Sequence, residues 1–248
     1  MAKLRSPGGC PWDREQTHDS IKGHLVEEAF EVIDALDRRD FNDLREELGD
    51  LLLQVVFHSQ LAAETGLFTV DDVIHEIVIK LKRRHPHVFG DAEAATSAEV
   101  LVHWEKIKAT EKDRPSVLTG VPEAMPALAY SQKLQEKAAR VGFDWRVTEE
   151  ILDKLSEEVG EFIAADRRTR ALEDEFGDVL FTLVNLARHL GIDSELALRR
   201  AAKKFKNRFE GMECMARDEG VDFAGSSLDE KERMWECVKE KEETDDGH

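Results

Sequence analysis

The 248-residue sequence has little cysteine, which argues against a fold held together by disulfides or structural zinc. Its three cysteines, Cys10, Cys214 and Cys237, are widely spaced and form neither a CxxC pair nor a Cys/His zinc pattern. The N-terminal segment lacks the apolar core of a signal peptide, and no stretch approaches the roughly 18 apolar residues that a membrane span requires. We therefore expect a protein of the reducing cytoplasm with no membrane partner.

Basic residues are also in deficit, since 35 Lys and Arg stand against 53 Asp and Glu and give a net charge of −18. Nucleic acids attract proteins through Lys and Arg that face phosphates, so a nucleic-acid partner is not expected. The phosphate-binding loop GxxxxGK[ST] is absent, which excludes a P-loop enzyme. The apolar fraction of 41% nevertheless is typical of a folded globular protein.

Apolar residues recur at intervals of three and four, as in Leu25, Ala29, Val32 and Leu36. This spacing is typical of amphipathic helices. No run of alternating apolar and polar residues bounded by turn signals indicates a β-sheet. The sequence therefore predicts an all-α protein.

Four blocks of sequence occur twice in the same order. The first half reads HLVEEAFEVIDAL, LREELGDLLLQVV, KLKRRHPHVF and VHWEKIK, and the second reads KLSEEVGEFIAA, LEDEFGDVLFTLV, KFKNRFE and RMWECVK. A tandem duplication of one helical bundle explains this repeat most simply. Three of the six prolines lie between the halves and indicate a linker. We expect helical domains over residues 1–114 and 127–248, joined by a linker over 115–126.

Each half carries two acidic motifs, EExxE on one helix and ExxD on the next. Carboxylates three or four residues apart project from nearly the same face of a helix. They border the apolar stripes, so packing of the two helices brings them into one groove. The candidate metal ligands are Glu28, Glu31, Glu47 and Asp50 in the first half and Glu158, Glu161, Glu175 and Asp178 in the second.

Clustered carboxylates repel one another unless protons or cations compensate their charge. Mg²⁺ is the favoured ion, with Mn²⁺ as the alternative, because Mg²⁺ combines one or two carboxylates with substrate phosphates and keeps several waters. A Lys and an Arg one helical turn apart occur in each half, Lys80 with Arg84 and Lys204 with Arg208. We expect these cations to balance the phosphate charge that the metal ion does not neutralise.

The duplicated acidic motifs resemble the MazG family of nucleoside triphosphate pyrophosphohydrolases, as do CPWD at 10–13, HPHVFG at 85–90 and VGFDW at 141–145. The resemblance covers essentially the whole chain. It implies an all-α fold, Mg²⁺ dependence, a homodimer and hydrolysis of NTPs and dNTPs between the α and β phosphates, giving a monophosphate and pyrophosphate. It also implies broad base specificity and a role in nucleotide house-cleaning or in control of a nucleotide signal.

The resemblance assigns roles residue by residue, and it credits the second domain with catalysis. The implied catalytic and metal-binding residues are Glu158, Glu161, Glu175 and Asp178, and the implied nucleotide contacts are Lys154, Lys204, Arg208 and Trp235. Glu157 is a candidate to orient or deprotonate the attacking water, with a surface ion pair as the alternative. Trp235 is expected either to stack on a base or to pack in the core.

Two points stay open from the sequence. Ala171 stands where the family can carry a lysine, with Arg168 and Arg170 nearby. The first-half motifs are intact, so the sequence does not decide whether that half turns over substrate. Two alternatives remain: a non-catalytic acidic helical interaction scaffold, and an all-α pyrophosphatase restricted to dUTP or dCTP.

Overall fold

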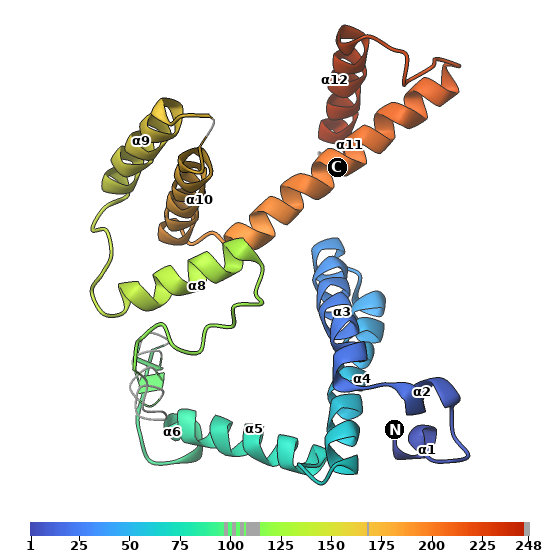
Figure 1. The fold of residues 1–248 in the computed structure, drawn as a ribbon, viewed down its shortest axis with the longest axis vertical. Helices are drawn as coiled ribbons and strands as arrows, with labels where there is room; N and C mark the ends of the chain where they lie inside the picture. The colour runs from blue at the N-terminus through green and yellow to red at the C-terminus, as the bar shows by residue number, and fades with distance from the viewer. Residues whose placement is uncertain (97–98, 101–102, 105–106, 108–114, 168, 246–248) are drawn as a thin grey trace. The chain divides into compact units, whose positions relative to one another are not determined.

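A computed structural model describes residues 1–96, 99–100, 103–104, 107, 115–167 and 169–245. Every regular element that these residues form is a helix, which confirms the predicted all-α class (Figure 1). None of the helices in the described ranges is long and apolar enough to cross a membrane. The chain separates into two compact units, Met1–Asp113 and Arg114–His248. Arg114, where we predicted that the first domain ends, lies outside the described residues.

The described elements of the first unit are α1 (Ala2–Arg5), α2 (Pro11–Glu15), α3 (His18–Arg38), α4 (Phe41–Glu64), α5 (Val70–Arg84) and α6 (Pro86–Phe89). Those of the second unit are α8 (Ala127–Ala139), α9 (Thr148–Ala164), α10 (Ala171–His189), α11 (Ser194–Asp218) and α12 (Leu228–Asp245). In each unit two consecutive long helices pack along each other, α3 with α4 and α9 with α10.

The α3–α4 hairpin is set by local chemistry at its ends. Thr17 and Ser20 form a reciprocal capping box at the start of α3. Arg39 ends that helix in the left-handed conformation, with φ of 54°. Asp40 then accepts the backbone N–H groups of Asn42 and Asp43 at 3.0 and 3.1 Å, so α4 begins at once. The short turn holds the helices antiparallel.

The α9–α10 hairpin repeats this arrangement in the second unit. Its connecting segment spans residues 165–170, in which Arg168 lies outside the described residues. Gly191 terminates α10 with φ of 71°, a conformation that favours glycine. Asp193 caps α11 by accepting the N–H of Leu196 at 2.9 Å.

The proline-containing segment expected to be a linker is held against the second unit. The buried Lys137 of α8 donates from Nζ to the carbonyl oxygens of Val117 at 3.2 Å and Thr119 at 2.9 Å. These bonds satisfy a buried ammonium with backbone acceptors. The segment therefore forms part of the wall of the second unit at these residues.

Each unit buries a small core and leaves long apolar stripes exposed. Ile21, Phe57 and Leu61 form the core cluster of the first unit, and Met212, Ala216 and Met234 form that of the α11–α12 hairpin. Exposed apolar residues on α3 and α4 include Leu25, Val26, Leu36, Leu48, Leu52, Leu53 and Val55. Those on α9 and α10 include Leu152, Val159, Ile163, Phe176, Leu180, Phe181 and Leu183.

Candidate functional site

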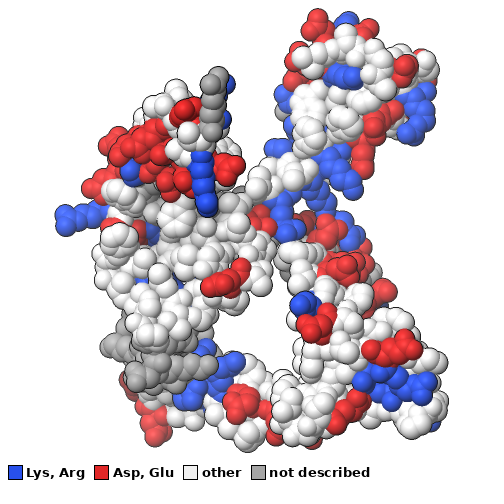
Figure 2. Space-filling model, in the orientation of Figure 1, with Lys and Arg blue, Asp and Glu red and all other residues white. Residues whose placement is uncertain are grey.

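Three carboxylates of the second unit converge across the α9–α10 hairpin. Glu158 and Glu161 project from α9 and Glu175 from α10, and one oxygen of each lies within 4.8 Å of the others. Figure 2 shows acidic side chains gathered over this hairpin. Glu158 is only 7% exposed, so its charge is largely removed from water. The structure therefore brings together three of the four ligands predicted for this unit.

The negative charge of this cluster favours the binding of a cation. Burial, followed by the charges of Glu158 and Glu175, raises the pKa of Glu161 above its ordinary value. Lys154, one turn earlier on α9, places Nζ 2.8 Å from Glu157 and 2.9 Å from Glu158. These hydrogen bonds raise the pKa of Lys154, so its ammonium stays charged at neutral pH. One ammonium thus faces a group of four glutamates.

Asp178, the fourth ligand implied by the resemblance, is exposed and stands outside the cluster at this distance. It lies three residues, about one turn, beyond Glu175 on α10. Ala171 begins α10, and Arg170 pairs loosely with Asp174 at 3.9 Å. Arg168, the other candidate to replace a lysine there, lies outside the described residues.

The first unit forms a second cluster of the same kind. Oxygens of Glu28, Glu47 and Asp50 lie within 4.8 Å of one another, and all three side chains are partly buried. Glu31 is exposed and is not part of this group. Burial, with the charges of Glu31 and Asp50, raises the pKa of Glu28. The amide of Gln54 donates to Glu28 at 3.4 Å, a contact that the motif spacing did not indicate.

The two units carry different residues at the position of Lys154. In the repeat, the position of Lys154 corresponds to His24, whose Nδ1 lies 3.0 Å from Glu27. A histidine side chain does not carry the permanent positive charge of a lysine ammonium. Burial, followed by the charges of Glu31 and Asp43, also raises the pKa of Glu47. The negative charge of the carboxylate cluster in the second unit is therefore better balanced than that of the cluster in the first unit.

The expected nucleotide contacts Lys204, Arg208 and Trp235 belong to the α11–α12 hairpin. Arg208 pairs with Glu242 at 2.7 Å, and its guanidinium lies 5.6 Å from the centre of the Trp235 ring. The Phe205 ring lies 5.5 Å from the same indole. Trp235 thus packs within the hairpin core, while Lys204 is exposed on α11. Within the described residues of this unit, neither Lys204 nor Arg208 forms an ion pair with a carboxylate of the cluster.

The donor set fits a hard divalent cation. All candidate ligand atoms in either cluster are carboxylate oxygens, which Mg²⁺ and Ca²⁺ prefer over the nitrogen and sulfur ligands typical of zinc. Three carboxylates with a raised pKa among them are also a group that gains from a bound positive charge. The ligand atoms of both clusters are therefore of the kind that a hard divalent cation prefers.

Comparison with known proteins places the chain in a family. The model of the MazG nucleotide pyrophosphohydrolase domain matches residues 16–89 and again residues 146–212. The chain is 46% identical over 250 residues to a nucleoside triphosphate pyrophosphohydrolase of Escherichia coli K12, covering 98% of this chain and 95% of that protein.

Two further relatives agree. A nucleoside triphosphate pyrophosphohydrolase/pyrophosphatase MazG of Thermotoga maritima is 46% identical over 98% of this chain and 94% of that protein. A nucleoside triphosphate pyrophosphohydrolase of Mycobacterium tuberculosis is 45% identical over 57% of this chain and 43% of that protein. The tandem all-α arrangement and the repeated acidic motifs are thus those of a known enzyme class. The chain belongs to the MazG family of nucleotide pyrophosphohydrolases, hydrolases that act on phosphorus-containing anhydrides.

Proposed function

We propose that the protein hydrolyses nucleoside triphosphates and their deoxy forms to the monophosphate and pyrophosphate, with Mg²⁺ or Mn²⁺ held by the second unit. The observation that carries this proposal is the convergence of Glu158, Glu161 and Glu175 beside Lys154. The 46% identity to relatives named for this activity supports the reaction class. Broad base specificity and a role in nucleotide house-cleaning or signal control in the cytoplasm are parts of the same proposal.

Different side chains of the protein bind the metal ion and activate the water. Glu158, Glu161 and Glu175, joined by Asp178, would hold the ion. Bound Mg²⁺ supplies charge neutralisation on the triphosphate and lowers the pKa of a water. Glu157 then orients the attacking water toward the α-phosphorus and accepts its proton, after release from Lys154.

Cations of the chain complete the site. Lys154 exchanges its carboxylate partners for a phosphate oxygen when the triphosphate enters, because an ammonium serves either anion. Lys204 and Arg208 stabilise the charge of the departing pyrophosphate. The bond that breaks joins the α-phosphorus to the bridging oxygen, and the oxygen of water replaces it.

A homodimer is part of the proposal. Large apolar side chains such as Phe176, Leu180 and Ile163 of the α9–α10 hairpin are exposed at 49%, 40% and 76%. Exposed apolar stripes of this length mark an interface, and two-fold pairing of identical hairpins would bury both at once. Such pairing also offers a route by which α11–α12 cations of one copy reach the carboxylates of the other.

Product analysis tests the proposal. The protein is incubated with a panel of ribo- and deoxynucleoside triphosphates, with and without Mg²⁺, and the products are separated by anion exchange. Monophosphate with pyrophosphate, formed only with metal, is the expected result. Diphosphate with phosphate would contradict α–β cleavage. Turnover of dUTP or dCTP alone would favour the restricted pyrophosphatase. The absence of both product and Mg²⁺-induced stabilisation would favour the scaffold.

A further inference from the structure

Arg208 of α11 is held in one orientation by two neighbours on α12. Its Nε donates to Oε2 of Glu242 at 2.7 Å, and its guanidinium carbon lies 5.6 Å from the centre of the Trp235 ring. A cation at this distance over an indole is attracted by the negative face of the ring. The side chain of Arg208 is only 16% exposed, and that of Glu242 is 36% exposed. A carboxylate and an aromatic ring therefore restrain this long side chain together.

The close packing of α11 against α12 brings Glu242 to Arg208. A Cβ atom at Gly211 would lie 3.1 Å from Val238, so the two helices approach closely at this glycine. Arg208 precedes Gly211 by three residues, and Glu242 follows Val238 by four residues. Because the two helices form an antiparallel hairpin, both side chains lie about one turn from the point of close approach, in the same direction (Figure 1). The ion pair thus follows from the register of the hairpin.

The ion pair uses only part of the guanidinium. An arginine side chain carries N–H donors on Nε and on both Nη atoms. Among the residues that the structure describes, Nε of Arg208 donates to a carboxylate and neither Nη atom does. Two neighbouring Nη groups match two oxygens of a phosphate. Glu242 therefore holds one edge of the guanidinium and leaves the other edge for an anion.

The repeated sequence carries the same acid in both halves. Glu242 lies seven residues after Trp235, and Glu111 lies seven residues after Trp104. The first unit also repeats the contact between arginine and tryptophan, because the guanidinium of Arg84 lies 5.2 Å from the centre of the Trp104 ring. Glu111 itself lies outside the described residues. The sequence thus pairs the carboxylate with the arginine and the tryptophan in each copy of the repeat, apart from the other acidic residues near the C-terminal end.

We propose that Glu242 is a positioning residue, which orients Arg208 so that both of its Nη groups bind phosphate oxygens of the substrate. The inference rests on the proposed function, in which Arg208 binds the pyrophosphate part of the nucleotide. A mobile arginine side chain loses conformational freedom when it binds a ligand, and this loss weakens binding. In this hairpin Arg208 is ordered before the substrate arrives. Glu242 acts through Arg208 and needs no contact of its own with the substrate.

The test is a double-mutant cycle in the full-length protein. Glu242→Ala should lower kcat/KM for ATP with Mg²⁺ by about threefold to tenfold, because Arg208 must then be ordered when the substrate binds. In the Arg208→Ala background the same substitution should change kcat/KM by less than about twofold, because no guanidinium is left to orient. Equal losses in the two backgrounds would show that Glu242 only stabilises the hairpin and would overturn the positioning role.

Further variants control for charge and folding. Glu236→Ala removes another carboxylate of α12, which pairs with Lys239 at 2.8 Å, and should leave kcat/KM within about twofold of wild type. Glu242→Gln keeps an oxygen that accepts from Nε of Arg208 and should retain kcat/KM within about threefold of wild type. Thermal unfolding reports whether Glu242→Ala is folded. If it is not, Glu242→Met, which keeps the length of the side chain without an acceptor, carries the test.

An equilibrium measurement separates this inference from the proposed function. Isothermal titration with Mg²⁺ measures the Kd of α,β-methylene ATP, which cannot be hydrolysed between the α and β phosphates. Glu242→Ala should raise this Kd by about threefold to tenfold, and that result supports the positioning role even if the wild-type protein hydrolysed no triphosphate. Hydrolysis with unchanged Kd and kcat/KM in Glu242→Ala would overturn the positioning role and leave the proposed function standing. A lower Kd would also overturn it, because Glu242 would then compete with phosphate for Arg208.

Discussion

The ammonium of Lys154 lies 2.9 Å from a carboxylate oxygen of Glu158, one helical turn away on α9. Glu158 is the one buried residue among the eight predicted metal ligands, so its charge depends on partners inside the protein. Lys154 also holds Glu157 at 2.8 Å. One side chain therefore offsets part of the negative charge of the proposed metal site and restrains the proposed general base.

Replacing Lys154 by Met should separate metal binding from catalysis. The loss of a neighbouring positive charge strengthens Mg²⁺ binding by about threefold to tenfold, because the ammonium no longer competes for the carboxylates. The KM for triphosphate rises and kcat falls, because a phosphate contact is lost. Isothermal titration with Mg²⁺ and steady-state kinetics measure the two effects. The exposed Lys3→Met is the control, and weaker Mg²⁺ binding by Lys154→Met would contradict this role.

Matched substitutions in the two clusters should assign turnover to one unit. Glu158→Gln removes a buried ligand and lowers kcat by about 100-fold or more. Glu28→Gln, its counterpart in the repeat, retains about half of the activity or more, because that unit carries His24 in place of Lys154. Glu76→Gln on α5 controls for loss of a surface charge. Equal losses in the two cluster variants would show that both units contribute to turnover.

Mg²⁺ binding should weaken as the pH falls. The pKa of Glu161 is raised by burial and by Glu158 and Glu175, and the ion requires the ionised carboxylate. Without metal the sign is opposite: the raised pKa favours the folded state below 4.5, and that contribution is lost as the pH rises through the folded value. The Mg²⁺-induced increase in melting temperature should therefore shrink between neutral pH and about pH 5. In Glu161→Gln the remaining increase should depend less on pH.

Removal of Arg5 should destabilise the first unit. Its guanidinium contacts both carboxylate oxygens of Glu64, with two distances of 2.8 Å, and also donates to the carbonyls of Asp13 and Gln16. Arg5→Ala lowers the free energy of unfolding by about 1–3 kcal/mol, because these acceptors lose a charged donor. Urea denaturation measures the change, with Lys3→Ala on the same helix as the control.

The same ion pair predicts a pH dependence. Hydrogen bonding to Arg5 holds the pKa of Glu64 below its ordinary value of 4.5. A depressed carboxyl pKa stabilises the fold above pH 4.5, and the contribution is lost as the pH falls through the folded value. The stability difference between wild type and Arg5→Ala should therefore narrow in acid. A stability difference that does not change with pH would instead indicate that Arg5 stabilises the fold by packing against Phe57.

The carboxylate clusters were predictable from the sequence because they follow from local geometry. Residues three apart on a helix share a face, which predicts that Glu158 and Glu161 project together. Their approach to Glu175 required only that the two apolar stripes pack. The same spacing did not bring Asp178 or Glu31 into its cluster, because that also depends on how the two helices pack. The all-α class followed from the same periodicity.

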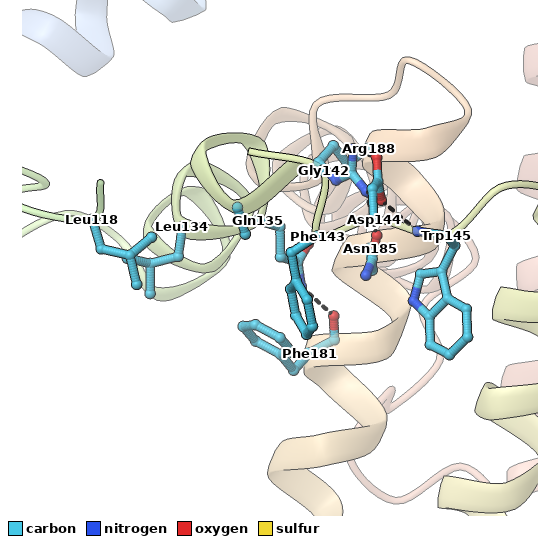
Figure 3. A pocket seen from close by; sticks show the side chains of 11 residues that line it. Leu118, Leu134, Gln135, Gly142, Phe143, Asp144, Trp145, Phe181, Asn185 and Arg188 are labelled. Atoms are coloured by element: carbon cyan, nitrogen blue, oxygen red, sulfur yellow. Dashed lines mark hydrogen bonds and ion pairs between the residues drawn. The ribbon is translucent and has the colours of Figure 1, made fainter. Parts of the chain in front are cut away.

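A cavity of the second unit, lined by Phe143, Trp145 and Phe181 among others, was not predictable in this way (Figure 3). It depends on contacts between α8 and α10, such as the hydrogen bond from Gln135 to Phe181 over 46 positions of sequence. No spacing rule relates those residues. Trp145, the last residue of the VGFDW segment, lines this cavity.

The fate of the oxygen from water tests the central claim most directly. The protein is incubated with a nucleoside triphosphate and Mg²⁺ in heavy-oxygen water, and each product is examined by mass spectrometry. Attack on the α-phosphorus predicts one heavy oxygen in the monophosphate and none in the pyrophosphate. A label in pyrophosphate, with an unlabelled monophosphate, would place the attack on the β-phosphorus and contradict the proposed geometry.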